Sequence, residues 1–97
     1  MEKIRVFYLD NCPYCKNAMR AFFELKNTDD KYHDIDIDWV NETSSPQIAD
    51  QYDYWYCPSM FLGKEKLYEA QPGETYEQCH ANVVRVLDQY LEQTKGA

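Results

Sequence analysis

The sequence predicts an α/β domain in which helices flank a four-stranded mixed sheet. Three observations support this fold class. A short apolar run at residues 4–9 leads directly into an amphipathic helical pattern. Two further short strand-like runs lie on either side of Gly63-Lys64, and a long helical stripe ends the chain. The predicted order is β-α-β-α-β-β-α in a single domain over residues 1–97, a length suited to one hydrophobic core.

The first predicted strand and helix lie on either side of a three-residue connector, residues 10–12. Residues 4–9 are apolar and rich in branched or aromatic side chains, as expected of a buried strand. Pro13 suits the first helical position because it has no N–H to leave unpaired. The helix is expected to reach about Leu25, where the polar residues 27–30 interrupt its pattern. Its apolar stripe contains Ala18, Met19, Phe22 and Phe23.

The second predicted strand, residues 32–39, alternates between apolar and acidic side chains. The apolar residues of one face are Ile35, Ile37 and Trp39, and the acidic residues of the other are Asp34, Asp36 and Asp38. This pattern predicts an edge strand with one solvated face. We interpret the acidic face as protection of the edge, since alternating carboxylates on a flat strand do not converge on a metal. A strand joined to the first through a helix should run parallel to it.

A short helix and a β-hairpin follow. Ser45-Pro46 offers an N-cap and first-turn pair for a helix through about Tyr52. Residues 59–62 and 65–68 predict two strands, and Gly63 at the first central position of their loop fits a type II′ turn. The hairpin would make the sheet mixed.

A capping-box pattern marks the start of the final helix. Thr75 and Gln78 have the spacing at which each side chain can bond to the backbone N–H of the other. The helix is expected to reach about residue 93. The residues predicted on its apolar face are Tyr76, Cys79, Val83, Leu87 and either Tyr90 or Leu91.

The charge of the chain argues against two classes of partner. Ten basic and seventeen acidic residues give a formal charge of −7, which disfavours nucleic acid and anionic membrane surfaces. No apolar run is long enough to span a membrane, and we find no signal-peptide pattern. We therefore expect a cytoplasmic protein.

The four cysteines are distributed as a close pair, Cys12 and Cys15, and two isolated residues, Cys57 and Cys79. This distribution favours a redox motif in a reducing compartment over a secreted disulfide scaffold. Cys12 stands at the predicted start of a helix, where the partial positive charge should lower the pKa of its thiol. Because the thiolate is the species that attacks disulfides, the motif predicts thiol–disulfide exchange. A structural disulfide or an inert pair is the alternative interpretation.

The motif and its surroundings resemble the glutaredoxins of the thioredoxin-fold superfamily. The resemblance rests on Cys12-Pro13-Tyr14-Cys15-Lys16 directly after the first strand, and on Pro58 just before the hairpin. It covers nearly the whole chain. It implies a thioredoxin-like fold with a cis peptide bond before Pro58, facing the cysteine pair.

The resemblance also implies roles for individual residues. Cys12 would attack a disulfide, and Cys15 would resolve the mixed disulfide that results. The residues that the resemblance implies for substrate binding are Pro13, Tyr14, Cys57 and Pro58. The implied substrates are disulfides of proteins or of small thiols, with glutathione or a reductase as electron donor. We expect a monomer without a tightly bound cofactor, with glutathione as a candidate co-substrate.

The sequence departs from the glutaredoxin pattern at three places. Asp10-Asn11 replaces a usual lysine before the motif, and Tyr56-Cys57-Pro58 replaces threonine-valine-proline. Pro72-Gly73-Glu74 replaces a glycine pair before the last helix. Asp10 and Glu74 each place a negative charge where anionic glutathione would bind, at a cost on the order of 1 kcal/mol per contact. We therefore expect weakened glutathione binding.

Two other classes of function remain open from the sequence. One is an iron–sulfur or metal carrier that uses Cys12 with Cys57 or with thiols of a partner. Pro13 and the second motif cysteine, Cys15, are features that the glutaredoxin resemblance associates with redox chemistry rather than with cluster binding. The other is a thioredoxin-like binding module whose cysteines are incidental.

Several side chains allow both a structural and a functional interpretation. Cys57 is either a small buried hydrophobe or, with its sulfur near Cys12, a modulator of the redox pair. Cys79 should be buried, and the two histidines, His33 and His80, should be exposed or half-buried. The aromatic run at residues 52–56 should mainly pack in core and loop. An exposed part of this run could form an apolar shelf for a protein substrate.

Overall fold

A four-stranded mixed sheet with strand order β2-β1-β3-β4 forms the centre of the computed structural model, which describes residues 3–94. The strands are β1 (Ile4–Tyr8), β2 (Ile37–Asn41), β3 (Ser59–Leu62) and β4 (Glu65–Glu69). β1 runs parallel to β2 and antiparallel to β3, and β3 is antiparallel to β4. The predicted mixed sheet and its strand directions are confirmed. Residues 1–2 and 95–97 of the predicted domain lie outside the described residues.

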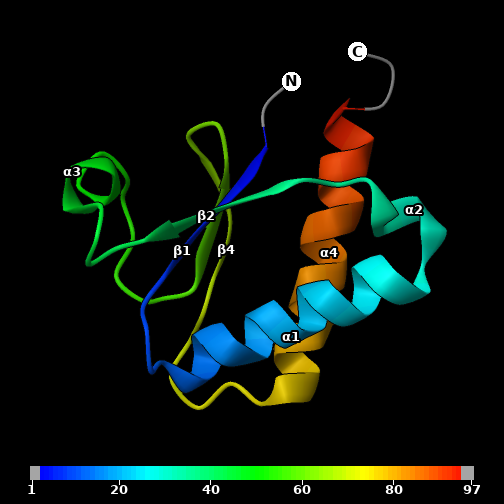
Figure 1. Cartoon of the computed structure of the whole chain (residues 1–97), viewed down its shortest axis with the longest axis horizontal. Coiled ribbons are helices and arrows are strands. Elements are labelled where there is room, and N and C mark those ends of the chain that lie inside the picture. The colour runs from blue at the N-terminus through cyan, green and yellow to red at the C-terminus, as the bar shows by residue number, and fades with distance from the viewer. Residues whose placement is uncertain (1–2, 95–97) are drawn as a thin grey trace.

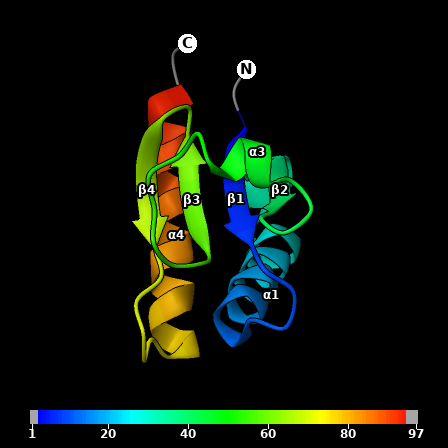
Figure 2. The same cartoon turned by 90° about the vertical axis from the view of Figure 1, so that its left-hand side faces the viewer.

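Helices cover both faces of this sheet. They are α1 (Pro13–Thr28), α2 (Asp30–His33), α3 (Pro46–Ala49) and α4 (Tyr76–Thr94). Figure 1 shows α1 and α4 packed together on one side of the strands, with α3 on the other. Figure 2, turned by 90°, shows the strands in the order β4, β3, β1, β2 with α3 in front of them and α1 and α4 behind. The chain therefore forms three layers.

Each face of the sheet has its own apolar cluster. The larger cluster fills the space between the sheet and the two long helices, and includes Ile4, Val6, Phe22, Met60, Val83 and Leu87. The smaller cluster lies under α3 and contains Phe7, Val40, Ala49 and Phe61. Phe7 of β1 is fully buried and packs against the rings of Tyr52 and Tyr54. This second layer holds the segment after α3 in place beside the end of β1.

The predicted end of α1 is wrong by three residues. The helix continues past Leu25 to Thr28 because its last polar residues bond back to the helix itself. Asn27 Nδ2 donates to the carbonyl of Phe23, and Thr28 Oγ1 donates to the carbonyl of Glu24, each at 2.7 Å. The chain then forms α2, which the sequence analysis did not predict.

The predicted start of the second strand is also wrong. β2 begins at Ile37 rather than at residue 32. Tyr32 belongs to α2, is buried, and donates its hydroxyl hydrogen to Asp88 of α4. The contact with α4 thus favours a helical conformation for this segment, although its alternating sequence pattern predicts a strand. β2 is an edge strand as predicted. The face that carries Asp38 is solvated only in part, however, since Val40 on the same face is buried.

The remaining element starts agree with the prediction. α3 begins at Pro46 but ends at Ala49, and only irregular turns continue to Tyr52. Gly63 has a φ of 61° at the first central position of the hairpin loop, as a type II′ turn requires. α4 begins directly after Thr75 and ends at Thr94. Among the described helices, none has the length and apolar character that crossing a bilayer requires.

A candidate thiol site at the start of helix α1

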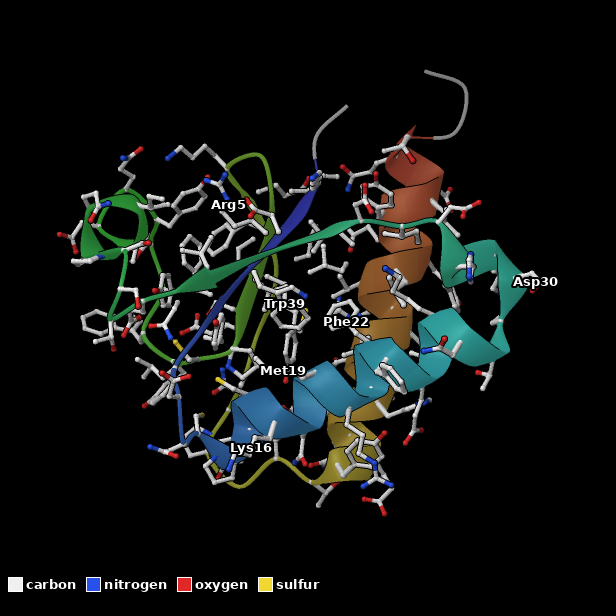
Figure 3. All side chains as sticks on the ribbon, in the orientation of Figure 1. Arg5, Lys16, Met19, Phe22, Asp30 and Trp39 are labelled. Carbon is white, nitrogen blue, oxygen red and sulfur yellow. The ribbon has the colours of Figure 1, made fainter. Side chains whose placement is uncertain are left out.

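The cysteine pair lies at the junction between the end of β1 and the start of α1. Asn11 has a φ of 63°, in the left-handed region that asparagine tolerates better than most residues. This turn places Cys12 at the N-cap of α1, with Pro13 in the first helical position as predicted. The carbonyl of Cys12 accepts the N–H of Lys16 at 3.0 Å, so the helix starts within the motif. In Figure 3, Lys16 marks this first turn, at the end of the ribbon that comes from β1.

The two motif cysteines differ sharply in accessibility. Cys12 is half-buried, whereas Cys15, one turn into α1, is only 1% exposed. Both are free thiols. Of the two sulfurs, only that of Cys12 is therefore accessible from the surface.

A cis peptide bond lies opposite the pair. It joins Cys57 to Pro58, where the resemblance implied it. The carbonyl oxygen of Cys57 lies 3.8 Å from the sulfur of Cys12, and Pro58 is buried. The fold thus brings residues 45 positions apart together at the end of β1.

The thiol of Cys57 faces Cys15. Its sulfur is not the neighbour of Cys12, because the backbone carbonyl of Cys57 takes that place. Its S–H donates to Oε1 of Glu42, with the sulfur 3.5 Å from that oxygen, and the Cys57 side chain also lies beside Cys15. Three cysteine thiols and one carboxylate therefore lie close together, and of these four groups only Cys15 is buried.

The site favours the thiolate at Cys15. The hydrogen bond from Cys57 lowers the pKa of Cys15 to about 6, with help from the N–H of Leu9 at 3.5 Å and from the thiol of Cys12, although burial opposes it. Burial raises the pKa of Cys12, and the backbone N–H groups of Tyr14 and Cys15 offset this only in part. The N–H groups at the helix start thus lower the pKa of Cys12 as expected, but burial outweighs them, so the predicted net lowering is wrong. The lowered pKa belongs to its buried partner.

Tyr14 joins the motif to the turn before α4. Its hydroxyl oxygen accepts the backbone N–H of Gly73 at 2.8 Å. The next two N–H groups of that turn are also bonded internally, Glu74 to the carbonyl of Gln71 at 3.1 Å and Thr75 to the side chain of Gln78 at 2.9 Å. The three consecutive N–H groups from Gly73 to Thr75 are thus already in use, and none points unpaired toward an anionic ligand.

The capping box closes this turn as predicted. The N–H of Gln78 donates to Thr75 Oγ1 at 3.1 Å, which completes the reciprocal pair. The carboxylate of Glu74 accepts hydrogen bonds from the hydroxyl of Tyr68 and from Nδ2 of Asn82. Glu74 is therefore part of the structure that holds the start of α4.

Asp10 leaves a negative charge beside the motif. It is exposed two residues before Cys12, and it accepts a hydrogen bond from Nδ2 of Asn41 at 3.2 Å. Within residues 3–94, no basic side chain forms an ion pair with Asp10. The negative charge of Asp10, which we expect to repel anionic glutathione, therefore lies at the surface.

The aromatic run divides into a packed and an exposed part, as predicted. Tyr52 and Tyr54 pack against the smaller core cluster. Trp55 is 87% exposed and Tyr56 49% exposed, next to Cys57. The backbone N–H groups of both exposed residues donate to Oε2 of Glu69 at 2.7 Å, so this loop is fixed to β4.

The isolated cysteine and the histidines lie as predicted. Cys79 is 2% exposed in α4, and burial raises its pKa to about 11. His33 is exposed and His80 is half-buried. Within the described range 3–94, no group of three or more His, Cys, Asp and Glu residues could hold a metal ion.

Glu42 and Tyr54 are site residues that the sequence analysis missed. Tyr54 Oη donates to Oε1 of Glu42 at 2.6 Å, and the same oxygen accepts from Cys57. A signal for Glu42 was present: it directly follows β2, whose carboxyl end lies at the same edge of the sheet as the end of parallel β1. Nothing in the sequence pointed Tyr54 toward that edge.

Fold and site together define a class of protein. It is an α/β domain with an accessible and a buried cysteine at a helix start, opposite a cis-proline that joins an aromatic loop to the sheet. No protein-family model matches the chain, and no curated protein matches it significantly.

Proposed function

We propose that this protein is a glutaredoxin-like thiol–disulfide oxidoreductase with a thioredoxin-like fold, and that it reduces disulfides of proteins or mixed disulfides of glutathione. The observation that carries the proposal is the paired arrangement of an accessible Cys12 and a buried Cys15 with a lowered pKa. Thiolate character and access are the two properties that thiol–disulfide exchange requires.

Cys12 makes the first attack. Its S–H is hydrogen-bonded to Cys15, which holds the thiolate at rest. The proton passes from Cys12 to Cys15 as the sulfur of Cys12 attacks the substrate disulfide. The bond between Cys12 and one substrate sulfur forms, the substrate S–S bond breaks, and the leaving thiolate takes a proton.

Cys15 completes the reaction. Once it has released its proton to the leaving thiolate or to water, its thiolate attacks the sulfur of Cys12. The Cys12–Cys15 disulfide forms and the second substrate thiolate leaves. The substrate is thereby reduced by two electrons and the dithiol is oxidised, so that an external thiol or a reductase must regenerate it.

The backbone beside Pro58 supplies the place for an extended substrate. A polypeptide could pair there as an added strand, with the shelf of Trp55 and Tyr56 beside it. The occupied N–H groups from Gly73 to Thr75 and the charge of Asp10 disfavour capture of glutathione carboxylates. These features favour a protein disulfide as substrate and a reductase as donor.

Turnover of a protein disulfide, with a small dithiol as electron donor, tests the proposal. The wild-type protein should reduce it, and Cys12→Ser should abolish turnover. Cys15→Ser should accumulate a mixed disulfide on Cys12, which intact mass spectrometry detects. Cys79→Ala, which removes a buried thiol outside the pair, is the matched control and should retain activity. Equal activity in wild type, Cys12→Ser and Cys15→Ser would refute the assignment.

A further inference from the structure

Cys57 is a third thiol at the site, and the proposed reaction does not use it. Its side chain is half-buried, whereas Cys15 is buried. The carbonyl oxygen of Cys57 lies 3.8 Å from the sulfur of Cys12, and the exposed Trp55 stands two residues before it. A disulfide that reaches Cys12 therefore also comes close to Cys57, and some feature of the site must keep the two thiols from reacting alike.

The carboxylate of Glu42 binds the Cys57 thiol. The S–H of Cys57 donates to Oε1 of Glu42, with the sulfur 3.5 Å from that oxygen. The same oxygen accepts the hydroxyl of Tyr54 at 2.6 Å, and the backbone N–H of Glu42 donates to the carbonyl of Tyr8 at 3.0 Å. Within residues 3–94, no basic side chain forms an ion pair with Glu42. Its charge therefore acts on Cys57 without a neighbouring cation to offset it.

This contact disfavours a thiolate at Cys57 in two ways. The hydrogen bond stabilises the protonated sulfur, and the carboxylate repels a negative charge there. Contact with Cys15, burial and Glu42 all raise the pKa of Cys57. Because the thiolate is the nucleophile in disulfide exchange, a sulfur held in the protonated form reacts slowly.

The titratable groups that face Cys57 come from α1, from the residue after β2 and from its own loop. They are Cys12 and Cys15, Glu42, and Tyr54. A Cys15 thiolate would also repel a charge on Cys57. The effect of Glu42 is therefore isolated in a protein that lacks both cysteines of the pair.

We propose that Glu42 determines which thiol completes the reaction, because its carboxylate holds Cys57 as an unreactive thiol and leaves Cys15 to form the disulfide with Cys12. The inference rests on the proposed function for the identity of the pair. Glu42 is a positioning residue that acts through Cys57. Without the carboxylate, a Cys57 thiolate attacks a disulfide: the bond from Cys57 to one substrate sulfur forms, the substrate S–S bond breaks, and the leaving thiolate takes a proton.

The test is the rate at which iodoacetamide alkylates Cys57, followed by peptide mass spectrometry across a range of pH. Every variant is made in the full-length Cys12→Ser/Cys15→Ser protein. Glu42→Gln should raise the rate about tenfold near pH ~8, since a thiol pKa lower by one unit gives about ten times more thiolate. The rate should also level off at a lower pH. Glu42→Asp, which retains a carboxylate, should react more slowly than Glu42→Gln.

Glu65→Gln is the matched control, since it removes the same charge from the far end of the sheet, where Glu65 pairs with Leu62. It should leave the alkylation rate unchanged. Equal rates for Glu42→Gln and Glu65→Gln would overturn the inference. Equal acceleration by Glu42→Gln and Glu42→Asp, with no change in the pH at which the rate levels off, would also overturn it, because a loosened loop rather than a lost charge gives that result.

A second measurement uses the protein with all four cysteines and a neutral small disulfide, bis(2-hydroxyethyl) disulfide. Glu42→Gln should carry a mercaptoethanol adduct on Cys57, and the wild-type protein should not. Equal adducts on Cys57 in both proteins would contradict the inference. The alkylation test needs no turnover, so a rate that depends on Glu42 in a protein without disulfide reductase activity would refute the oxidoreductase proposal alone. A rate independent of Glu42 in an active protein would refute this inference alone.

Discussion

The lowest thiol pKa of the site belongs to Cys15, the less accessible member of the pair. Below a pH of about 6 the Cys15 thiolate takes up a proton. Cys12 then has no thiolate beside it to accept its own proton. We predict that the reduced protein forms its first thiolate near that pH, seen as an ultraviolet absorbance step. The step should survive in Cys12→Ser and vanish in Cys15→Ser. Loss of the step in Cys12→Ser instead would place the resting thiolate on Cys12.

The residue types of the site were largely predictable, but their contacts were not. The spacing of Cys12 and Cys15 and the helix-starting Pro13 located the pair from sequence alone. The contacts of Cys15 with Cys57, and of Cys57 with Glu42, depend on three loops that converge at one sheet edge. No local pattern encodes such contacts. Burial therefore reverses the direction that the position at the helix start predicts for the pKa of Cys12.

At the scale of elements, the start of α4 depends on its capping box. Thr75 Oγ1 accepts the N–H of Gln78, and alanine cannot replace this bond. Thr75→Ala should lower the free energy of unfolding by about 1 kcal/mol and the melting temperature by about 4–8 °C. Thermal unfolding followed by circular dichroism measures the change. Thr43→Ala, in the exposed loop after β2, is the control, and an equal effect there would refute the capping role.

The loop before Pro58 presents Trp55 to solvent while its backbone is fixed to Glu69. If this shelf binds a polypeptide, Trp55→Ser should raise the KM for a protein disulfide several-fold, since exposed aromatic residues dominate many interfaces. The rate with a small disulfide should not change. Phe23→Ser is the control because Phe23 is 69% exposed on a later turn of α1. Equal losses with both substrates would exclude a docking role.

Element boundaries were predicted well where local chemistry decides them. Pro13, Pro46 and Thr75 marked helix starts because each suits or caps a first turn. The starts of β2 and α2 depend instead on Tyr32 reaching Asp88 across the domain. The alternating pattern from residue 32 onward could not include that contact, so it extended the strand too far.

A groove between α1 and β2, lined in part by Met19, Phe22 and Trp39, is a second feature that local patterns could not predict. Figure 3 shows Phe22 of α1 and Trp39 of β2 facing each other with Met19 beside them, and the ring centroids of Phe22 and Trp39 lie 5.5 Å apart. The helical period and the strand alternation each predicted these residues to face inward. That they meet at the open edge of the sheet follows only from the strand order.

For the whole molecule, the formal charge of −7 should affect which small thiols react with the protein. Asp10 is exposed beside Cys12, and its charge should repel anionic glutathione. Asp10→Asn should lower the KM for glutathione several-fold at low ionic strength, and added salt should reduce the difference. The Glu65→Gln protein, with the same net charge, controls for the overall field. An effect of equal size in both variants would assign it to net charge rather than to Asp10.

A redox titration tests the central claim most directly. The protein is equilibrated in thiol–disulfide buffers of graded potential, its free thiols are alkylated, and the pairing is mapped by peptide mass spectrometry. We predict one reversible two-electron transition in which Cys12 and Cys15 become linked while Cys57 and Cys79 stay alkylated. A pair that remains reduced at every potential, or a first disulfide that involves Cys57, would contradict a Cys12–Cys15 redox centre.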